Sequence, residues 1–256
     1  YVTPAELPED MDGFKAQQHR WTKGCIQVCQ KMLFDIWRAK IPFKAKMEAT
    51  THLTCNYSYL ALILLCLLVM PICLQYISPW GVMSWDGLPM IFLTAFLFFF
   101  ATVSVCIFYI TAEMIVRPNR WWRVFFFIIP LLALGVGMAV NNAKAVLEAV
   151  FGKPSEFVRT PKFGESQEGS KSIEKRASNY KALKSVLVPV LELMFGLFFA
   201  SVEVINLSHF FYSWDIAALV NFVLMSPFLG FFYTSLCSFA RLIDGVRQRK
   251  RAAAAS

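Results

Sequence analysis

Five long apolar stretches dominate this 256-residue chain and restrict the folds open to it. They cover residues 57–77, 90–112, 124–140, 185–207 and 215–239. All except 124–140 are long enough to cross about 30 Å of hydrocarbon at about 1.5 Å per helical residue. Hydrophobic residues make up 57% of the chain and charged residues 16%, whereas soluble domains average about 45–50% and about 25%. We therefore expect a mainly α-helical, polytopic membrane protein.

The basic residues lie beside the apolar stretches and predict a topology. Residues 1–52 hold 8 Lys and Arg, 117–123 hold 3, 141–184 hold 9 and 241–251 hold 5, whereas the loops 78–89 and 208–214 hold none. Basic segments stay on the cytoplasmic side of a membrane, so these two loops are expected outside. The segments before and after the stretch 124–140 then lie on the same side, so this stretch does not cross.

We accordingly predict four transmembrane helices in two hairpins, at about 57–77, 90–112, 185–207 and 215–239, with both ends cytoplasmic. The segment 124–150 is expected to be interfacial or re-entrant, and Pro130, Gly135 and Gly137 interrupt its apolar part. Five spans, which would export the basic cluster at 247–251, are the alternative. We expect an integral protein of a bacterial inner (plasma) membrane.

Composition also bounds the partners. The net charge is +8, but no basic, aromatic-rich soluble segment is present, so membrane lipids and no nucleic acid are expected. The seven cysteines include no Cys-x-x-Cys pair, which predicts neither a zinc site nor a disulfide framework. The chain begins without Met and without a signal peptide pattern, and we expect it to be the C-terminal portion of a longer protein.

Residues 1–50 are the most polar part of the first half of the chain. Pro4 and Pro8 predict an extended surface segment, and 13–38 has the pattern of an amphipathic helix. The apolar residues of this helix form a stripe: Trp21, Cys25, Val28, Met32 and Ile36. Such a helix is typical of a membrane interface.

The sequence Gln17-Gln18-His19-Arg20-Trp21 lies within this predicted helix. Gln17, Arg20 and Trp21 fall at i, i+3 and i+4 and share one face. An amide, a guanidinium and an indole together suit a phosphorylated sugar donor, because the guanidinium binds phosphate oxygens and the indole stacks on a sugar ring. The alternative is an interfacial anchor, with Trp21 at the headgroups and Arg20 reaching water.

A long hydrophilic loop covers residues 152–181, after a short predicted helix at 143–151 that Gly152 and Pro154 end. It contains Phe157, Thr160 and Lys162 in a short cluster. A hydroxyl, a cation and backbone amides are able to close over a diphosphate. A solvated linker with one hydrophobic contact is the alternative reading.

The apolar stretch 185–207 carries two acids, Glu192 and Glu203, eleven residues apart and therefore on nearly the same helical face. Phe199 and Asn206 lie close to that line. Acids within a membrane helix usually face a bundle interior or a water-filled path. The four residues are expected either to line a channel or to stabilise helix packing.

Two of these motifs together resemble the membrane-embedded family 2 glycosyltransferases, the class of cellulose synthase, hyaluronan synthase and the cellulose-synthase-like mannan synthases. Gln17-Gln18-His19-Arg20-Trp21 is similar to the Gln-x-x-Arg-Trp signature of that family, and 4–8 (Pro-Ala-Glu-Leu-Pro) is typical of its members. Residues 157–164 (Phe-Val-Arg-Thr-Pro-Lys-Phe-Gly) resemble the family's gating loop. Arg159 stands where Val is usual, and Phe163 separates Lys162 from the glycine.

The resemblance implies a role for each matched residue. Trp21 would stack beneath the acceptor sugar, Gln17 and Arg20 would help to hold the donor diphosphate, and Thr160 and Lys162, in the loop that begins at Phe157, would contact the nucleotide. The family also uses Mg²⁺ or Mn²⁺ held by an Asp-x-Asp and a general-base Asp, all upstream of the Trp motif. Asp10 and Asp12 read Asp-Met-Asp but lie too close to Gln17, so they are interpreted as surface acids. No catalytic base or metal ligand is therefore assigned to this chain.

The resemblance thus predicts the C-terminal part of a processive β-glycosyltransferase, inactive by itself. Residues 1–50 would end its cytosolic α/β transferase domain and include the interfacial helix, and 51–256 would form the membrane domain. Its partners would be a nucleotide-diphosphate sugar and a polysaccharide or glycan acceptor. A non-processive transferase with a lipid acceptor and a non-enzymatic transporter or scaffold are the alternatives.

Overall fold

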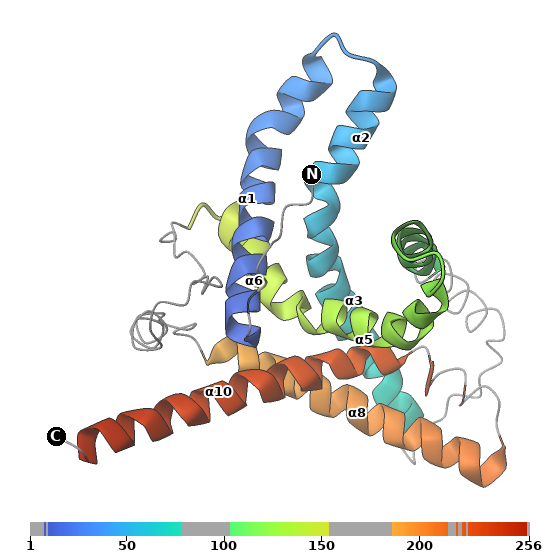
Figure 1. Cartoon of the computed structure of the whole chain (residues 1–256), viewed down its shortest axis with the longest axis vertical. Helices are drawn as coiled ribbons and strands as arrows, with labels where there is room; N and C mark the ends of the chain where they lie inside the picture. Colours follow the sequence, from blue (N-terminus) through green and yellow to red (C-terminus); the bar gives the residue numbers. More distant parts are fainter. Residues whose placement is uncertain are drawn as a thin grey trace. The chain divides into compact units, whose positions relative to one another are not determined.

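The computed structural model describes residues 8, 10–77, 103–153, 186–214, 219, 222–223 and 225–254. Its regular elements in this part of the chain are helices, with no strand, which confirms the mainly α-helical class (Figure 1). The expected edge of an α/β domain stays a prediction, since 1–7 lie outside the described residues.

The helices follow one another along the chain with short connections. They are α1 (Met11–Arg38), α2 (Phe43–Thr54), α3 (Ser58–Ile77), α5 (Val124–Gly137), α6 (Ala139–Val150), α8 (Leu187–Ser213) and α10 (Leu229–Ala254). Three-residue 3-10 turns precede α3, α5 and α10: η1 (Cys55–Tyr57), η2 (Trp121–Arg123) and η3 (Ser226–Phe228). A further apolar helix covers Val103–Val116.

Two described helices are long and apolar enough to cross a membrane, namely Phe43–Leu68 and Leu187–Tyr212. The pair formed by α5 and α6 is bent by 40° at Met138 and is either a broken span or a re-entrant loop. The interfacial or re-entrant segment expected at 124–150 is one of these two possibilities and stays a prediction. Pro130 does not interrupt α5, which continues to Gly137.

The predicted spans differ in outcome. The stretch 185–207 lies almost entirely within α8, and 57–77 is helical throughout in η1 and α3. The first part of 90–112 lies outside the described residues, and its last ten residues belong to the helix Val103–Val116.

The prediction of one continuous helix over 215–239 is wrong in its described part. Pro227 lies in the turn η3, and α10 begins only at Leu229. Proline has no N–H to donate, so it suits the first turn of a new helix rather than the interior of an old one. From Leu229 the helix runs past the predicted end at 239, through the basic residues, to Ala254.

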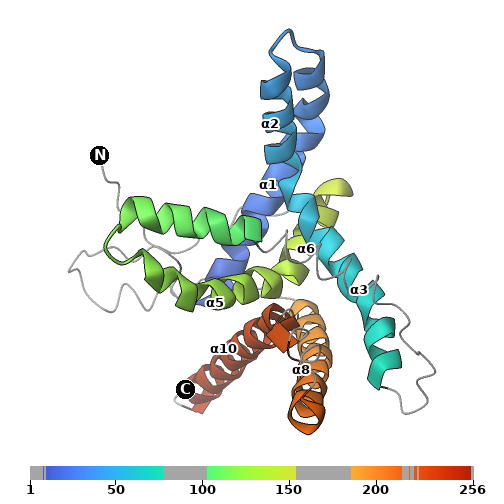
Figure 2. The ribbon, with the colours of Figure 1, turned by 90° about the vertical axis from the view of Figure 1, so that its right-hand side faces the viewer.

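The first of two compact units comprises Tyr1–Leu64, Met138–Leu191 and Thr234–Ser256. In it, α1 and α2 form a helical hairpin and lie side by side in both views (Figures 1 and 2). Trp37 near the end of α1 donates from Nε1 to Thr50 Oγ1 at 2.9 Å, and Lys46 Nζ donates to the Trp37 carbonyl at 2.8 Å. These bonds hold the two arms of the hairpin together at its turn.

Helix α6 packs against the first half of α1 in the same unit. Their apolar contact is small: Ile26 of α1 meets Val146 and Ala149 of α6, and Tyr57 and Leu60 cover it. Alanines on the buried face of α6 allow α1 to approach closely, and most of the remaining contact is polar. This polar contact forms the candidate site.

The second unit comprises Leu65–Gly137 and Glu192–Tyr233. Here a glycine on α8 allows close approach of α10, because a Cβ on Gly196 would lie 2.6 Å from both the Cα and the N of Phe232. Phenylalanine rings fill the adjacent space: the Phe195 and Phe231 centroids are 5.3 Å apart, and those of Phe199 and Phe228 are 4.4 Å apart. This unit is therefore held by aromatic packing around close backbone contacts.

Candidate functional site

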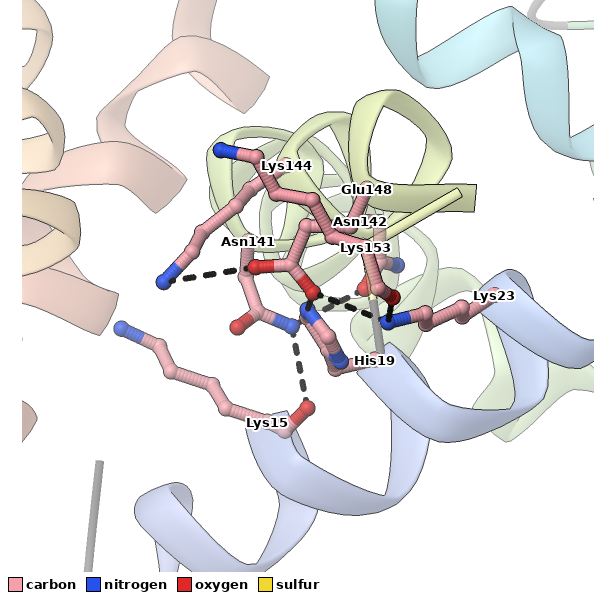
Figure 3. Close-up of polar contacts among 8 residues, drawn as sticks. All are labelled: Lys15, His19, Lys23, Asn141, Asn142, Lys144, Glu148 and Lys153. Carbon is pink, nitrogen blue, oxygen red and sulfur yellow. Dashed lines mark hydrogen bonds and ion pairs between the residues drawn. The ribbon is translucent and has the colours of Figure 1, made fainter. Parts of the chain in front are cut away.

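A line of three basic side chains follows one face of α1 and points into the first unit. Lys15, His19 and Lys23 are four residues apart, so they lie one above the other on the helix (Figure 3). Lys15 is 0% exposed and Lys23 is 4% exposed. Charged side chains are this deeply buried only where partners compensate them, and each of the three has such partners.

Glu148 on α6 is the acid at the centre of this network. Its Oε2 lies 3.2 Å from His19 Nε2 and 3.4 Å from Lys23 Nζ, and its Oε1 lies 3.9 Å from Lys144 Nζ. Figure 3 shows the carboxylate between the side chains of α1 and that of Lys144. One carboxylate of α6 therefore holds two positions of α1, one helical turn apart.

Amide and carbonyl groups complete the contact between α1 and α6. Asn141 Nδ2 donates to the Lys15 carbonyl at 2.9 Å and to Asn142 Oδ1 at 3.0 Å, and both asparagines are fully buried. Lys23 Nζ also donates to the Lys153 carbonyl at 2.6 Å, just beyond the end of α6. The N-terminal half of α1 is thus fixed at three successive turns.

The first turn of α1 is fixed by acids. Asp10 caps the helix, with Gly13 N donating to its Oδ1 at 2.5 Å, and forms an ion pair with Arg241 of α10. Lys15 Nζ donates to Ser238 Oγ at 2.8 Å and to the Thr234 carbonyl at 3.3 Å. Burial, followed by the neighbouring Asp10 charge, raises the pKa of Asp12.

The acids in Asp10-Met11-Asp12 therefore have structural partners and do not fit a divalent cation. Among the described residues, no group of three or more His, Cys, Asp or Glu is placed to hold a metal ion. The interpretation of Asp12 as a surface acid is wrong, because it is only 6% exposed. No step of a reaction is assigned to a metal on this chain.

The sequence motif lies on the side of α1 that faces away from α6. Gln17 and Arg20 are half-buried, whereas Trp21 is 61% exposed. The expected apolar stripe continues from Trp21 through Val28 and Met32, which are also exposed. The rigid, polar side of α1 and the open, motif-bearing side are thus opposite faces of one helix.

The four residues predicted to share a face of α8 are all buried. Glu192 and Phe199 are 0% exposed, Glu203 is 4% exposed and Asn206 is 3% exposed. Phe199 packs on Phe228 within the second unit. Neither carboxylate oxygen of Glu203 has a hydrogen-bond partner among the described residues. The shared buried face is present, and its role as a channel lining stays a prediction.

The loop residues Phe157, Thr160 and Lys162 lie outside the described residues, so the structure brings no second motif to the site. The short helix predicted at 143–151 is present as α6, although it begins earlier, at Ala139. That extension adds Asn141 to the contact with α1.

The sequence reasoning missed Lys15, His19, Lys23 and Glu148 as site residues. The four-residue spacing of the three basic residues was a usable signal, because it places them on one helical line. They were assigned to a solvated face, since charge in sequence usually marks the surface.

Burial is also expressed in the chemistry of His19. Burial lowers the pKa of His19 below its usual 6.5, and the nearby Glu148 carboxylate acts in the opposite direction. Near neutral pH the imidazole is therefore favoured over the imidazolium, and it contacts Glu148 through Nε2. His19 is the one residue of the five-residue motif for which a contact with α6 is resolved here.

No protein-family model, curated protein or solved structure matches this chain. The similarity to glycosyltransferases therefore rests on the quoted motif residues themselves. Function is accordingly proposed from the site.

Proposed function

We propose that this chain is the C-terminal part of a membrane-embedded, processive β-glycosyltransferase. It would transfer sugar from a nucleotide-diphosphate donor to a growing polysaccharide and deliver the product across the membrane. The observation that supports this best is the exposed indole of Trp21 on a helix whose opposite face is fixed by buried polar contacts. An aromatic plane held rigidly in the open is suited to stacking on a sugar ring.

In this proposal each face residue has one task. Trp21 supports the acceptor sugar from below. Arg20 and Gln17 bind the donor diphosphate, where a permanent cation stabilises the charge that develops as the sugar–phosphate bond breaks. The metal ligands for Mg²⁺ or Mn²⁺ and the general base that deprotonates the acceptor hydroxyl belong to an upstream domain, so this chain by itself forms no glycosidic bond.

The membrane part of the proposal is a cytoplasmic site below a transmembrane path. Four spans in two hairpins keep both ends of the chain in the cytoplasm of a bacterial inner membrane. The buried face of α8, with Glu192, Phe199, Glu203 and Asn206, lines the path with carboxylates, an amide and an aromatic ring. A reporter fused after Arg251 is expected to read as cytoplasmic, and an external signal would refute this topology.

The site is tested in membranes from cells that express the full-length protein containing this chain. Trp21→Ala is expected to lower polymer synthesis from a radiolabelled nucleotide sugar by about 100-fold, since loss of the stacking surface misplaces the acceptor. Protein content and apparent stability should barely change, because Trp21 is 61% exposed.

Val28→Ala is the matched control, since Val28 lies on the same exposed stripe and is 43% exposed. It should retain full synthesis. Unchanged synthesis in Trp21→Ala would refute the assigned role of the indole. A short, lipid-linked product in the unmodified protein would replace the processive reaction with transfer to a lipid acceptor.

A further inference from the structure

Two pairs of residues alternate along the start of α1 and face opposite ways. His19 and Lys23 form one i, i+4 pair, and Gln17 and Trp21 form another, displaced by two residues. Each residue advances about 100° around an α-helix, so a displacement of two residues places the second pair about 160° from the first. Any rotation of α1 that moves the first pair therefore moves the second by the same angle.

The first pair is held by a single side chain of α6. Glu148 Oε2 lies 3.2 Å from His19 Nε2 and 3.4 Å from Lys23 Nζ. Only 21% of the Glu148 side chain is exposed, so water screens these interactions less than at an open surface. Contacts on two consecutive turns oppose rotation of α1 about its own axis.

A second contact from α6 opposes sliding. Asn141, seven residues and two turns before Glu148, donates to the Lys15 carbonyl at 2.9 Å. This bond is made to the backbone of α1, so it fixes the height of the helix rather than a side-chain conformation. Helix α6 therefore holds α1 at two points, one at each end of the motif.

We propose that Glu148 is a positioning residue for the glycosyl transfer reaction, acting through His19 and Lys23 to orient Gln17, Arg20 and Trp21. This inference rests on the proposed function. Glu148 does not touch donor or acceptor; it sets the angle at which the opposite face of α1 meets them. A rotation of α1 by a fraction of a residue moves the indole by an ångström or more, which is enough to slow a positioned reaction about 100-fold.

The kinetic test compares substitutions of two neighbouring charged residues in the full-length enzyme. Glu148→Ala is expected to lower kcat by about 100-fold and to change the KM for the nucleotide sugar by less than about 3-fold, since the transfer geometry is lost more than ground-state binding. Lys144→Ala is the control, because Lys144 lies 3.9 Å from the same carboxylate but contacts no residue of α1 in the described network. It should retain kcat.

A charge exchange separates positioning from simple folding. In Glu148→Lys with Lys23→Glu, the ion pair is restored with reversed polarity, so at least a tenth of the unmodified kcat should return relative to Glu148→Lys alone. Wild-type kcat in Glu148→Ala would overturn the proposal. So would a loss of kcat that only follows the loss of folded protein measured by size-exclusion chromatography.

A spectroscopic measurement tests positioning even if no transfer is found. The same proteins are labelled with fluorotryptophan, and the fluorine resonance of Trp21 is assigned by its absence in Trp21→Phe. Glu148→Ala should shift or broaden this resonance, whereas Lys144→Ala should leave it in place. An unchanged resonance in Glu148→Ala overturns the positioning role, and absence of any glycan product in the unmodified enzyme refutes the proposed function separately.

Discussion

The α1–α6 interface of the first unit buries lysines, amides and a carboxylate, whereas the α8–α10 contact of the second unit buries phenylalanine rings around a glycine. Polar partners such as Asn141 and the Lys15 carbonyl bond only at one distance and in one direction. Aromatic rings pack in several arrangements of similar energy. The first interface is therefore suited to fixing one orientation of a helix, and the second to bringing two helices close together.

The two interfaces also differ in how they treat buried charge. In the first unit, Lys15, Lys23 and Glu148 have partners within hydrogen-bonding or ion-pairing distance. In the second unit, Glu203 is buried without a hydrogen-bond partner for either oxygen among the described residues. A paired buried charge is consistent with a structural role, whereas an acid buried in a membrane helix is by default a functional one.

The largest expected effect breaks the close approach in the second unit. Gly196→Ala places a Cβ 2.6 Å from the backbone of Phe232, and backbone cannot move away without separating the two helices. The free energy of unfolding should fall by about 1–3 kcal/mol. Unfolding of the purified protein by SDS in mixed micelles measures this.

A second glycine provides the control. A Cβ on Gly24 of α1 would meet nothing within 4 Å, so Gly24→Ala should stabilise the helix by about 0.5–1 kcal/mol. Equal effects of the two substitutions would show that close approach does not govern the α8–α10 contact.

The next effect sharpens the difference between buried polar groups. Asn141→Ala removes the donor to the Lys15 carbonyl and should cost about 1–2 kcal/mol. Glu203→Gln replaces a buried acid of similar shape by a neutral group and should stabilise the protein by about 1 kcal/mol. Opposite signs in the same unfolding assay are expected. A destabilised Glu203→Gln protein would show that this carboxylate supports packing.

The smallest effect is the dependence of stability on pH through His19. Because burial lowers its pKa below 6.5, the unfolded chain binds a proton that the folded protein does not. Its contribution to stability is complete above pH 6.5 and decreases as the pH falls through the window between 6.5 and the lowered value. Unfolding measured from pH 5 to pH 8 should show this slope, and His19→Gln should reduce it. An identical slope in both proteins would contradict the assignment.

Much of the helical framework could be predicted from sequence. Hydrophobic length predicted α3 and α8, Gly152 and Pro154 marked the end of α6, and the eleven-residue spacing placed Glu192 and Glu203 on one buried face. These features depend on local spacing and local breakers, which a sequence displays directly.

The polar face of α1 could not be predicted in the same way. Lys15 and Lys23 carry charge, and only the partners on α6 and α10, more than a hundred residues away, make their burial affordable. The boundary between η3 and α10 was missed for a related reason: the apolar run continues across Pro227, so hydrophobicity did not mark the break. Long-range pairing and backbone chemistry decided these two features.

The assembly of the first unit from three separate chain segments has a consequence for biosynthesis. Lys15 of α1 waits for Ser238 of α10, which is 223 residues further along the chain. At about 5–20 residues per second, translation of that distance takes roughly 10–45 seconds. During this time α1 has left the ribosome with its buried lysine still uncompensated. The motif helix is thus among the first elements made and the last to reach its final orientation, after the membrane helices between the two residues have been synthesised.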